Sequence, residues 1–482
     1  MNKKSTHTAI FGGGPTGLTV ALLLAESGHD VTLVEREKNL GGCWRVEWVD
    51  GFFTHHSPHV LSTLSPHFFA ILKHIGIIVD DEIVETYKNG MFGIIKQLYN
   101  NLEFSDMIKL FISYISNLFY RNELTVDEWL NQNNITDNGK KFIRILSIAL
   151  QNIPEKVMMK DFLSITLNFD TKFVQFKDPE LWINKIYNYL KSLPNVTIMT
   201  GYYLDSINTN DDENRDIKTV SDVLIKNTSS DDVGITIGAD NYVLAMPPIA
   251  LLNVIEKSNI DVKNNWKSYS WLKEWVEKSH YSSFGFQLHF DKKIKYKTDW
   301  CSSCMGDWNI IILEESKYQT NGATHDESIV SVLSCTIVDF NAYSSHLKKT
   351  VNELEKDEVV NEAWRQIQEH TQINNEPIKT TVYDGVVKVN GKWTSKDTAF
   401  GRTKLGFLNQ MGKLDNLFSV GPHNNRVDSV TRIEYAITSA IELANELEPK
   451  SKTIIKFKKK TNGVMIILLI AIITVAIIQM TK

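Results

Sequence analysis

Apolar runs of strand length alternate with helical patterns along the chain. Near the start, an apolar run ending at Phe11 precedes a helical pattern over Leu18–Ala25 and a second apolar run over Val31–Glu35. Later segments continue the alternation: a helix over Leu181–Leu193, strands over Asn195–Met199, Gly201–Ile207, Asn241–Pro248 (stopped by its two prolines) and Leu417–Gly421, and a helix over Thr431–Ala444. Because such alternation builds parallel sheets, we predict a Rossmann-type α/β domain made from separate parts of the chain.

Two other regions have different patterns. Residues 62–180 are rich in apolar positions at helical spacing, and Thr125 with Glu128 forms a capping box that opens one predicted helix. Residues 251–400 alternate strand and helix, and Ser283–Phe290 has a period of two. This alternation places Phe286, Leu288 and Phe290 on one face and Gln287 and His289 on the other. We therefore expect a second, α+β domain.

The first βα turn contains a glycine motif. Gly12, Gly14 and Gly17 have the G-x-G-x-x-G spacing, with Pro15 and Thr16 between the last two glycines. In such turns the glycines allow a tight bend, an approach of backbone to a pyrophosphate, and close packing of helix on sheet. Glu35 ends the second strand 18 residues after Gly17 (35 − 17), where a ribose hydroxyl needs an acceptor. This context favours a dinucleotide site over an ordinary glycine turn.

Composition narrows the functional classes. The chain of 482 residues has a net charge of −5 and a pI of about 6.2, which argues against a nucleic-acid-binding surface. Its four cysteines are too scattered for a disulfide framework, and no secretory signal peptide is expected. The C-x-x-C pair Cys301 and Cys304 is compatible with coincidence, a redox pair or a metal site. No metal site is predicted from His55, His56 and His59, since no partner ligand is evident.

The C-terminal region predicts a membrane anchor. Gly463–Ile478 has no charged residue and is apolar all round, at the short end of the length that crosses a bilayer. The preceding segment is rich in lysine, which favours the cytosolic side. We predict a basic linker over 449–462 and a single-pass tail anchor over 463–480, with the globular part facing the cytosol. The alternative is a buried C-terminal helix.

Three segments resemble the flavin-containing amine oxidase and phytoene desaturase superfamily. They are the doublet Gly41–Gly42 with the later Pro58–His59, the strand Asn241–Pro248, and the strand and helix formed by Leu417–Gly421 and Thr431–Ala444. The resemblance implies an FAD-dependent oxidoreductase in which a substrate C–H bond gives a hydride to flavin N5, with reoxidation by oxygen or a quinone. It also implies noncovalent FAD, because no cysteine after Cys335 could tether the flavin.

The resemblance assigns residues and domains. The implied FAD-binding residues are Gly12, Gly14, Pro15, Thr16, Gly17, Glu35, Arg36, Gly41, Gly42, Trp44, Arg45, Pro58, His59, Leu204, Gly421, Arg432 and Ile433. The catalytic residues stay unknown, with His59, Gln287 and Phe400 as candidates. The FAD-binding domain would comprise residues 1–75, 181–250 and 405–448, and the substrate domain residues 76–180 and 251–404.

Several residues depart from the superfamily pattern. Tyr435 and Ala440 replace glycines, Pro422 replaces an acidic residue, and Gly285 stands where relatives often have a lysine near the flavin.

Two alternative functions stay open. Gly41–Trp44 also resembles flavin monooxygenases, although no second glycine-rich turn for NADPH is found. A third reading is a non-catalytic, protein-binding member of the fold, similar to GDP-dissociation inhibitors. The substrate is expected to be a small molecule, and a membrane anchor is compatible with a lipid-soluble one. The oligomeric state stays open.

Overall fold

A five-stranded parallel sheet forms the centre of the first lobe. The computed structural model describes residues 5–63, 65–87, 99–119, 123–149, 153–166, 172–210, 218–230, 233–296, 304–319, 326–397, 399–401, 403–424 and 432–449. The strand order is β22-β12-β1-β2-β8, and all four pairings are parallel. The strands are β1 (His7–Phe11), β2 (Asp30–Glu35), β8 (Val196–Thr200), β12 (Asn241–Leu244) and β22 (Leu417–Ser419). This arrangement confirms the predicted Rossmann-type fold.

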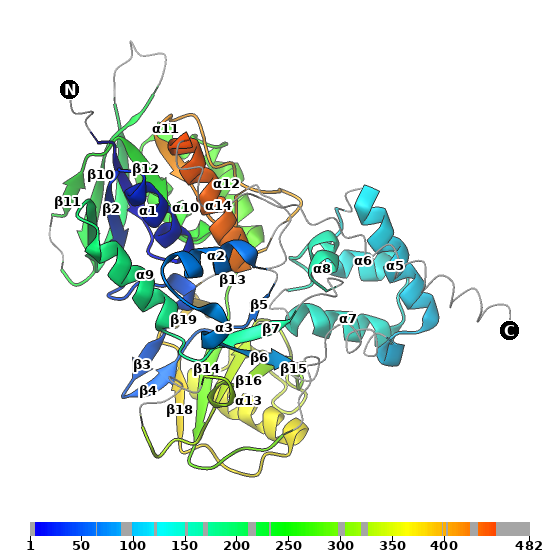
Figure 1. The fold of residues 1–482 in the computed structure, drawn as a ribbon. Helices are drawn as coiled ribbons and strands as arrows, with labels where there is room; N and C mark the ends of the chain where they lie inside the picture. The colour runs from blue at the N-terminus through cyan, green and yellow to red at the C-terminus, as the bar shows by residue number, and fades with distance from the viewer. Residues whose placement is uncertain are drawn as a thin grey trace.

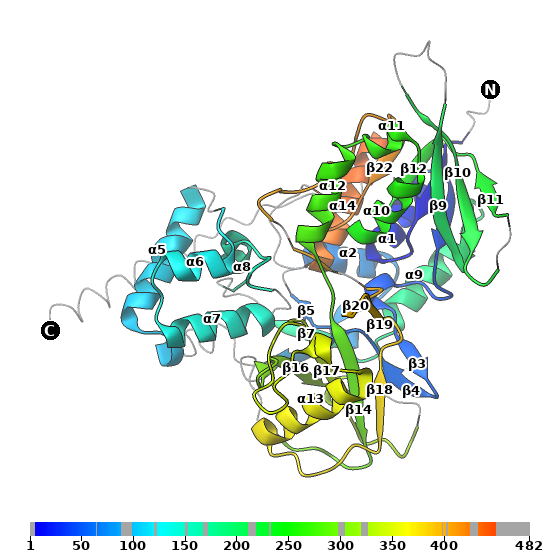
Figure 2. The same cartoon turned by 180° about the vertical axis from the view of Figure 1, so that it is seen from behind.

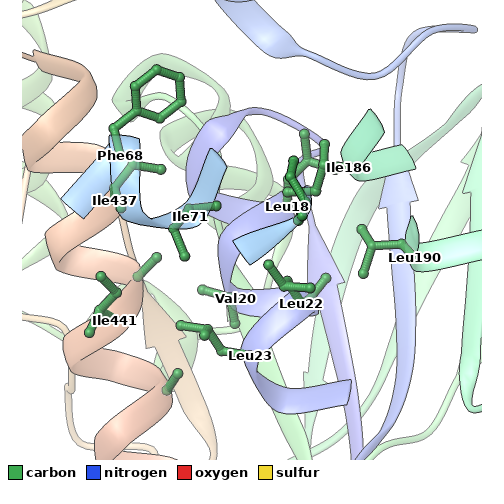
Figure 3. Close-up of a cluster of buried hydrophobic side chains, with 14 of the residues drawn as sticks. Leu18, Val20, Leu22, Leu23, Phe68, Ile71, Ile186, Leu190, Ile437 and Ile441 are labelled. Carbon is green, nitrogen blue, oxygen red and sulfur yellow. The ribbon is translucent and has the colours of Figure 1, made fainter. Parts of the chain in front are cut away.

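Helices cover one face of this sheet. Helix α1 (Pro15–Glu26) is buried almost all round, because α14 (Arg432–Leu447) and α2 (Pro66–His74) lie on one side of it and α9 (Leu181–Ser192) on the other. Figure 3 shows the leucines of α1 between Ile437 and Ile441 of α14 and Ile186 and Leu190 of α9. Glu434 of α14 accepts the backbone N–H groups of His67 and Phe68, at 3.1 Å each, and so caps α2.

The other face of the sheet is covered by a second layer. It consists of the antiparallel strands β9 (Tyr202–Thr209), β10 (Val220–Asn227) and β11 (Ile235–Ile237) and the helices α10 (Pro248–Lys257), α11 (Ile260–Lys263) and α12 (Tyr269–Ser279). Their apolar side chains form one core with Ala9 and Phe11 of β1 and with Tyr242 of β12. We call the central sheet and both covering layers the Rossmann lobe (Figure 1).

An antiparallel sheet forms a second lobe. Its order is β15-β16-β17-β14-β18, and α13 (Lys356–Thr371) packs against it. The strands are β14 (Phe284–Phe290), β15 (Cys304–Met305), β16 (Ile310–Glu314), β17 (Ser331–Ile337) and β18 (Lys379–Val382), and a hairpin of β19 (Val386–Val389) and β20 (Lys392–Ser395) follows. The alternation in β14 correctly predicts a strand, yet all seven residues are buried. Gln287 and His289 face β4 (Phe52–Thr54) and the chain that follows it. Strand β4 forms an antiparallel pair with β3 (Glu47–Val49).

A third, helical lobe lies to one side of the other two (Figure 2) and contains α5 (Phe104–Phe119), α6 (Val126–Gln132), α7 (Asp137–Ala149) and α8 (Met159–Thr166). The predicted capping box of α6 is present: Thr125 Oγ1 accepts the Glu128 N–H at 3.2 Å, and Glu128 Oε2 accepts the Thr125 N–H at 2.9 Å. Residues 62–180 are not helical throughout. A small antiparallel sheet has β7 (Phe173–Phe176) at its centre, between β5 (Leu61–Ser62) and β6 (Ile83–Tyr87).

The predicted tail anchor lies outside the described residues, because the description ends at residue 449. Within the described ranges, no helix combines the length and apolarity needed to cross a bilayer. Cys301 also lies outside these ranges, while Cys304 begins β15. The anchor and the role of the C-x-x-C pair therefore stay predictions.

Candidate cofactor and substrate site

A cavity of about 1530 Å³ lies at the carboxyl ends of the parallel strands, where all three lobes meet. Gly12 after β1, Glu35 at the end of β2, Ala245 after β12 and Gly421 after β22 all line it. Ligand sites in α/β folds occur at this edge of the sheet. The volume exceeds the roughly 300–1,000 Å³ of an ordinary small-molecule pocket, so the cavity has room for a large cofactor together with a second molecule.

The glycines allow three loops to approach closely beneath the N-terminus of α1. Gly12 has a φ of +114°, and a Cβ there would lie 2.3 Å from the carbonyl oxygen of Ala245. A Cβ at Gly42, with a φ of +54°, would lie 2.9 Å from Gly14 Cα. A Cβ at Gly17 would lie 1.9 Å from the Gly12 oxygen, so this glycine serves helix packing. The result is a side-chain-free cradle at a helix N-terminus, which suits a phosphate group.

Glu35 occupies the place predicted for a ribose acceptor. Its side chain is buried but lines the cavity, Oε2 accepts the Gly13 N–H at 2.6 Å, and Oε1 accepts the Glu37 N–H at 2.8 Å. Burial raises the pKa of Glu35, and these two hydrogen bonds counteract part of that rise. Each carboxylate oxygen still has a second lone pair, so the group is able to accept a diol hydroxyl while holding the glycine loop.

The turn after the second strand contributes a further part of the wall. Gly41 donates its N–H to the Gly13 oxygen at 2.8 Å, joining the two glycine segments. Trp44 lines the cavity and stacks on His59, with ring centroids 4.6 Å apart. Arg45 is buried at the wall, where Nε donates to Glu47 and Nη2 donates to the Tyr383 hydroxyl, each at 3.0 Å.

The histidine segment is clamped by the antiparallel lobe. Gln287 accepts the His55 N–H at 3.2 Å and donates to the His55 oxygen at 3.0 Å, so its amide pairs with both backbone groups of one residue. Gln287 is also completely buried and does not line the cavity. These contacts make Gln287 a support for the His55 backbone, and its place among the candidate catalytic residues stays a prediction. Nearby, a Cβ at Gly285 would lie 2.2 Å from the His56 oxygen, which leaves no room for the lysine found in relatives.

Sequence reasoning missed a buried carboxyl behind this wall. Glu315 is fully buried, and its Oε1 lies 3.3 Å from His55 Nε2. Burial raises the pKa of Glu315 to about 7 and lowers the pKa of His55 to about 3. Nothing in the local sequence around Glu315 distinguishes it from a surface carboxylate, since its neighbours Glu314, Ser316 and Lys317 are all polar.

Apolar side chains from the other lobes also line the cavity. They come from the helical lobe, the antiparallel lobe, the β19–β20 hairpin and the start of α14: Ile153, Ile311, Ile312, Leu313, Val338, Phe340, Val387, Val389 and Tyr435. They lie beside polar residues such as Asp339, Asn341 and Lys392. Phe400 also lines it, as predicted for a cavity wall, and packs beside Trp275 and His423 with centroids 5.6 and 6.3 Å away. Burial lowers the pKa of His423 to about 3, so this wall carries no histidine charge at neutral pH.

Most predicted cofactor residues converge on this one cavity. Those that line it are Gly12, Gly14, Pro15, Thr16, Glu35, Arg36, Gly42, Trp44, Arg45, Pro58, His59, Leu204, Gly421 and Ile433. Gly17 and Gly41 support the cradle from behind, and Arg432 begins α14. Among the described residues, no group of three or more His, Cys, Asp or Glu side chains is arranged to hold a metal ion.

Comparisons with known proteins agree with this geometry. The model of the NAD(P)-binding Rossmann-like domain matches residues 10–75. A 6-methylpretetramide 4-monooxygenase of Streptomyces rimosus is 52% identical over 42 residues, 9% of this chain and 10% of that protein. A 4,4'-diapophytoene desaturase of Staphylococcus aureus is 46% identical over 44 residues, 9% of each chain. The matched segments thus span about a tenth of these relatives.

Two solved structures resemble almost the whole chain. An oxidoreductase from Methanosarcina mazei has a TM-score of 0.59 at 14% identity, over 91% of this chain and 99% of that one. Putrescine oxidase bound to putrescine has a TM-score of 0.60 at 10% identity, over 92% and 99%. At such low identity the likeness concerns the fold. The chain therefore has the Rossmann-type α/β fold seen in these oxidoreductases, with a dinucleotide-binding domain at its start.

Proposed function

We propose that the protein is an FAD-dependent oxidoreductase that removes a hydride from a C–H bond of a small apolar substrate. The observation that carries the proposal is one cavity lined both by the glycine cradle beneath α1 and by apolar side chains of the other lobes, which we call the apolar compartment. FAD, when bound, would accept the hydride at N5 and pass the electrons to oxygen or a quinone. The protein's task is then to hold the two molecules together and exclude water.

The residues present fit a dinucleotide. Gly12, Gly14 and Gly42 leave backbone exposed for a pyrophosphate, and Glu35 retains acceptor capacity for a ribose. The start of α14, through Ile433, lines the same cavity and brings a helix N-terminus to it, which favours negative charge. The absence of a cysteine after Cys335 supports noncovalent binding.

The apolar compartment supports a lipid-soluble substrate. It is walled by isoleucine, leucine, valine and phenylalanine side chains, and Lys156, the nearest cation on the helical lobe, donates to the His280 oxygen at 2.7 Å. The predicted tail anchor would hold the chain at a membrane from the cytosolic side and so bring the cavity near such substrates. Fractionation of cells expressing the full chain and a chain ending at residue 449 tests the anchor: only the full chain should sediment with membranes.

A monooxygenase is the second candidate, because two matched relatives are named as such. Such an enzyme would consume NADPH and oxygen together, whereas the preferred reaction needs no NADPH. Substrate-dependent NADPH oxidation would therefore favour this alternative. A protein-binding role without cofactor is the third candidate, and a colourless protein would favour it.

The direct test is an absorbance spectrum of the full chain, purified in mild detergent, before and after heat denaturation. We expect the visible bands of oxidised flavin, released from the protein on heating. Gly42→Ala should lose most of this flavin, since its Cβ would lie 2.9 Å from Gly14 Cα. Gly238→Ala is the matched control, because its Cβ meets no atom within 4 Å. A folded wild-type protein that stays colourless with added FAD would refute the proposal.

A further inference from the structure

A buried carboxyl and buried imidazoles lie directly behind the cavity wall. Glu315 belongs to the short helix η3 (Glu315–Lys317), and Gln175 Nε2 donates both to Glu315 Oε2 at 2.6 Å and to the His59 oxygen at 2.9 Å. Gln319 Nε2 also donates to Glu315 Oε2, at 2.8 Å. Through Gln175, Glu315 is therefore connected to the backbone of His59, whose side chain lines the cavity.

Two atoms of this cluster, Glu315 Oε1 and His59 Nε2, make no hydrogen bond within the described residues, and both are shielded from solvent. The nearer imidazole, His55, lies 3.3 Å from Glu315 Oε1, but its Nε2 already has a partner in Ser334 Oγ at 2.7 Å. The other nitrogen of His59 donates to the Cys43 carbonyl, so His59 Nε2 is an acceptor. A buried acceptor without a donor costs about 1–3 kcal/mol. A proton kept on Glu315 would supply the missing donor, either after rotation of the carboxyl group or through one bridging water.

The surroundings favour one proton in this cluster. Burial lowers the pKa of His59 well below its usual range and raises that of Glu315 to about 7. The titratable groups that face the pair are His55 and His56, from the same loop as His59. The other packed elements contribute uncharged groups: Gln175 from β7, Ser334 from β17 and Gln319 after η3. At neutral pH, a proton on Glu315 therefore leaves the whole cluster without net charge.

We propose that Glu315 is a positioning residue that holds one proton behind His59 and gives it to His59 when negative charge enters the cavity. In this step the O–H bond of Glu315 breaks and an N–H bond forms at His59 Nε2, so an imidazolium lies at the wall with a carboxylate behind it. No other reactant is needed. The negative charge would come from an electron-rich bound cofactor, so this part of the inference rests on the proposed function.

Infrared difference spectroscopy of the full chain without cofactor tests the proton on Glu315. Raising the pH from 6 to 8 should remove the C=O stretching band of a protonated buried carboxyl. Glu315→Gln should lack this change while keeping the melting temperature, because an amide preserves the shape and a donor. Glu314→Gln is the control and should keep it. If Glu315→Gln leaves the difference spectrum unchanged, Glu315 holds no such proton and the proposal is wrong.

The midpoint potential of the bound flavin tests the delivery of the proton to His59. Below pH 7, Glu315→Gln and His59→Gln should each lower the potential, because the first variant has no carboxyl proton to give and the second has no imidazole to receive it, so the positive charge that stabilises reduced flavin is weakened or lost. His59→Gln should keep the infrared band of Glu315, which separates the two roles. Unchanged potentials in both variants would overturn the delivery step. Failure of the proposed function would appear separately, as a colourless protein whose infrared band is present.

Discussion

At the residue scale, the site depends on positions where no side chain fits. Gly285 is the clearest case outside the glycine motif, since a Cβ there would lie 2.2 Å from one backbone oxygen and 2.7 Å from another. These oxygens belong to His56 and His55, so the contact joins the antiparallel lobe to the cavity wall. A methyl group at this position must push two backbone segments apart.

Gly285→Ala is therefore expected to lower the free energy of unfolding by about 1–3 kcal/mol, the usual cost of overpacking a core. Urea denaturation monitored by tryptophan fluorescence would measure it. Gly238→Ala, at an open position, should change stability by less than about 0.5 kcal/mol. Equal stability of the two variants would show that the backbone at His55 and His56 moves aside without lowering the free energy of unfolding.

At the element scale, β14 joins the lobes through a polar face. Gln287 binds both backbone groups of His55, and His289 lies in edge contact with Phe52, with ring centroids 5.1 Å apart. Gln287→Leu should remove both hydrogen bonds and leave two buried backbone groups without partners, at about 1–3 kcal/mol each. We expect a lower melting temperature and weaker flavin retention. A stable Gln287→Leu protein that binds flavin but has lost turnover would instead support a catalytic role.

Elements were predictable where their signal is local. The five strands of the parallel sheet and the helices α1, α9 and α14 follow from short apolar periods, and the α6 cap follows from Thr125 and Glu128 three residues apart. The burial of both faces of β14 was not predictable, because it depends on a segment more than 200 residues earlier in the chain. The same holds for Glu315, whose partners His55 and Gln175 come from distant parts of the sequence. A polar cluster built from distant segments leaves no repeating pattern of apolar positions in the sequence, so it could not be predicted from such a pattern.

At the scale of the whole molecule, buried histidines make stability depend on pH. Burial lowers the pKa of His55 and His423 to about 3 and that of His280 and His289 to about 4. Between pH 6.5 and 4 the unfolded chain therefore binds protons at these four positions that the native protein does not bind. The free energy of unfolding must fall as the pH falls through this range.

Glu315 has the opposite effect, because its pKa of about 7 in the native protein lies above its value in the unfolded chain. It binds a proton only in the native protein between about pH 4.5 and 7, which offsets one of the four histidines. We expect a net loss of stability on acidification, steeper in Glu315→Gln. Urea denaturation at pH 7, 5.5 and 4.5 would measure both slopes. A flat profile would mean that the histidines are protonated in the native protein.

The parallel sheet also has a consequence for how the protein is made. Its edge strand β22 begins at Leu417, 410 residues after His7 of β1 (417 − 7), and α14 follows it (Figure 1). At about 5–20 residues per second, a ribosome needs roughly 20–80 s to synthesise that interval. Throughout this time the nascent chain exposes the apolar sides of α1 and α2 that α14 later covers. The order of the strands therefore leaves this apolar surface uncovered until late in synthesis, and we expect chaperones to bind it during translation.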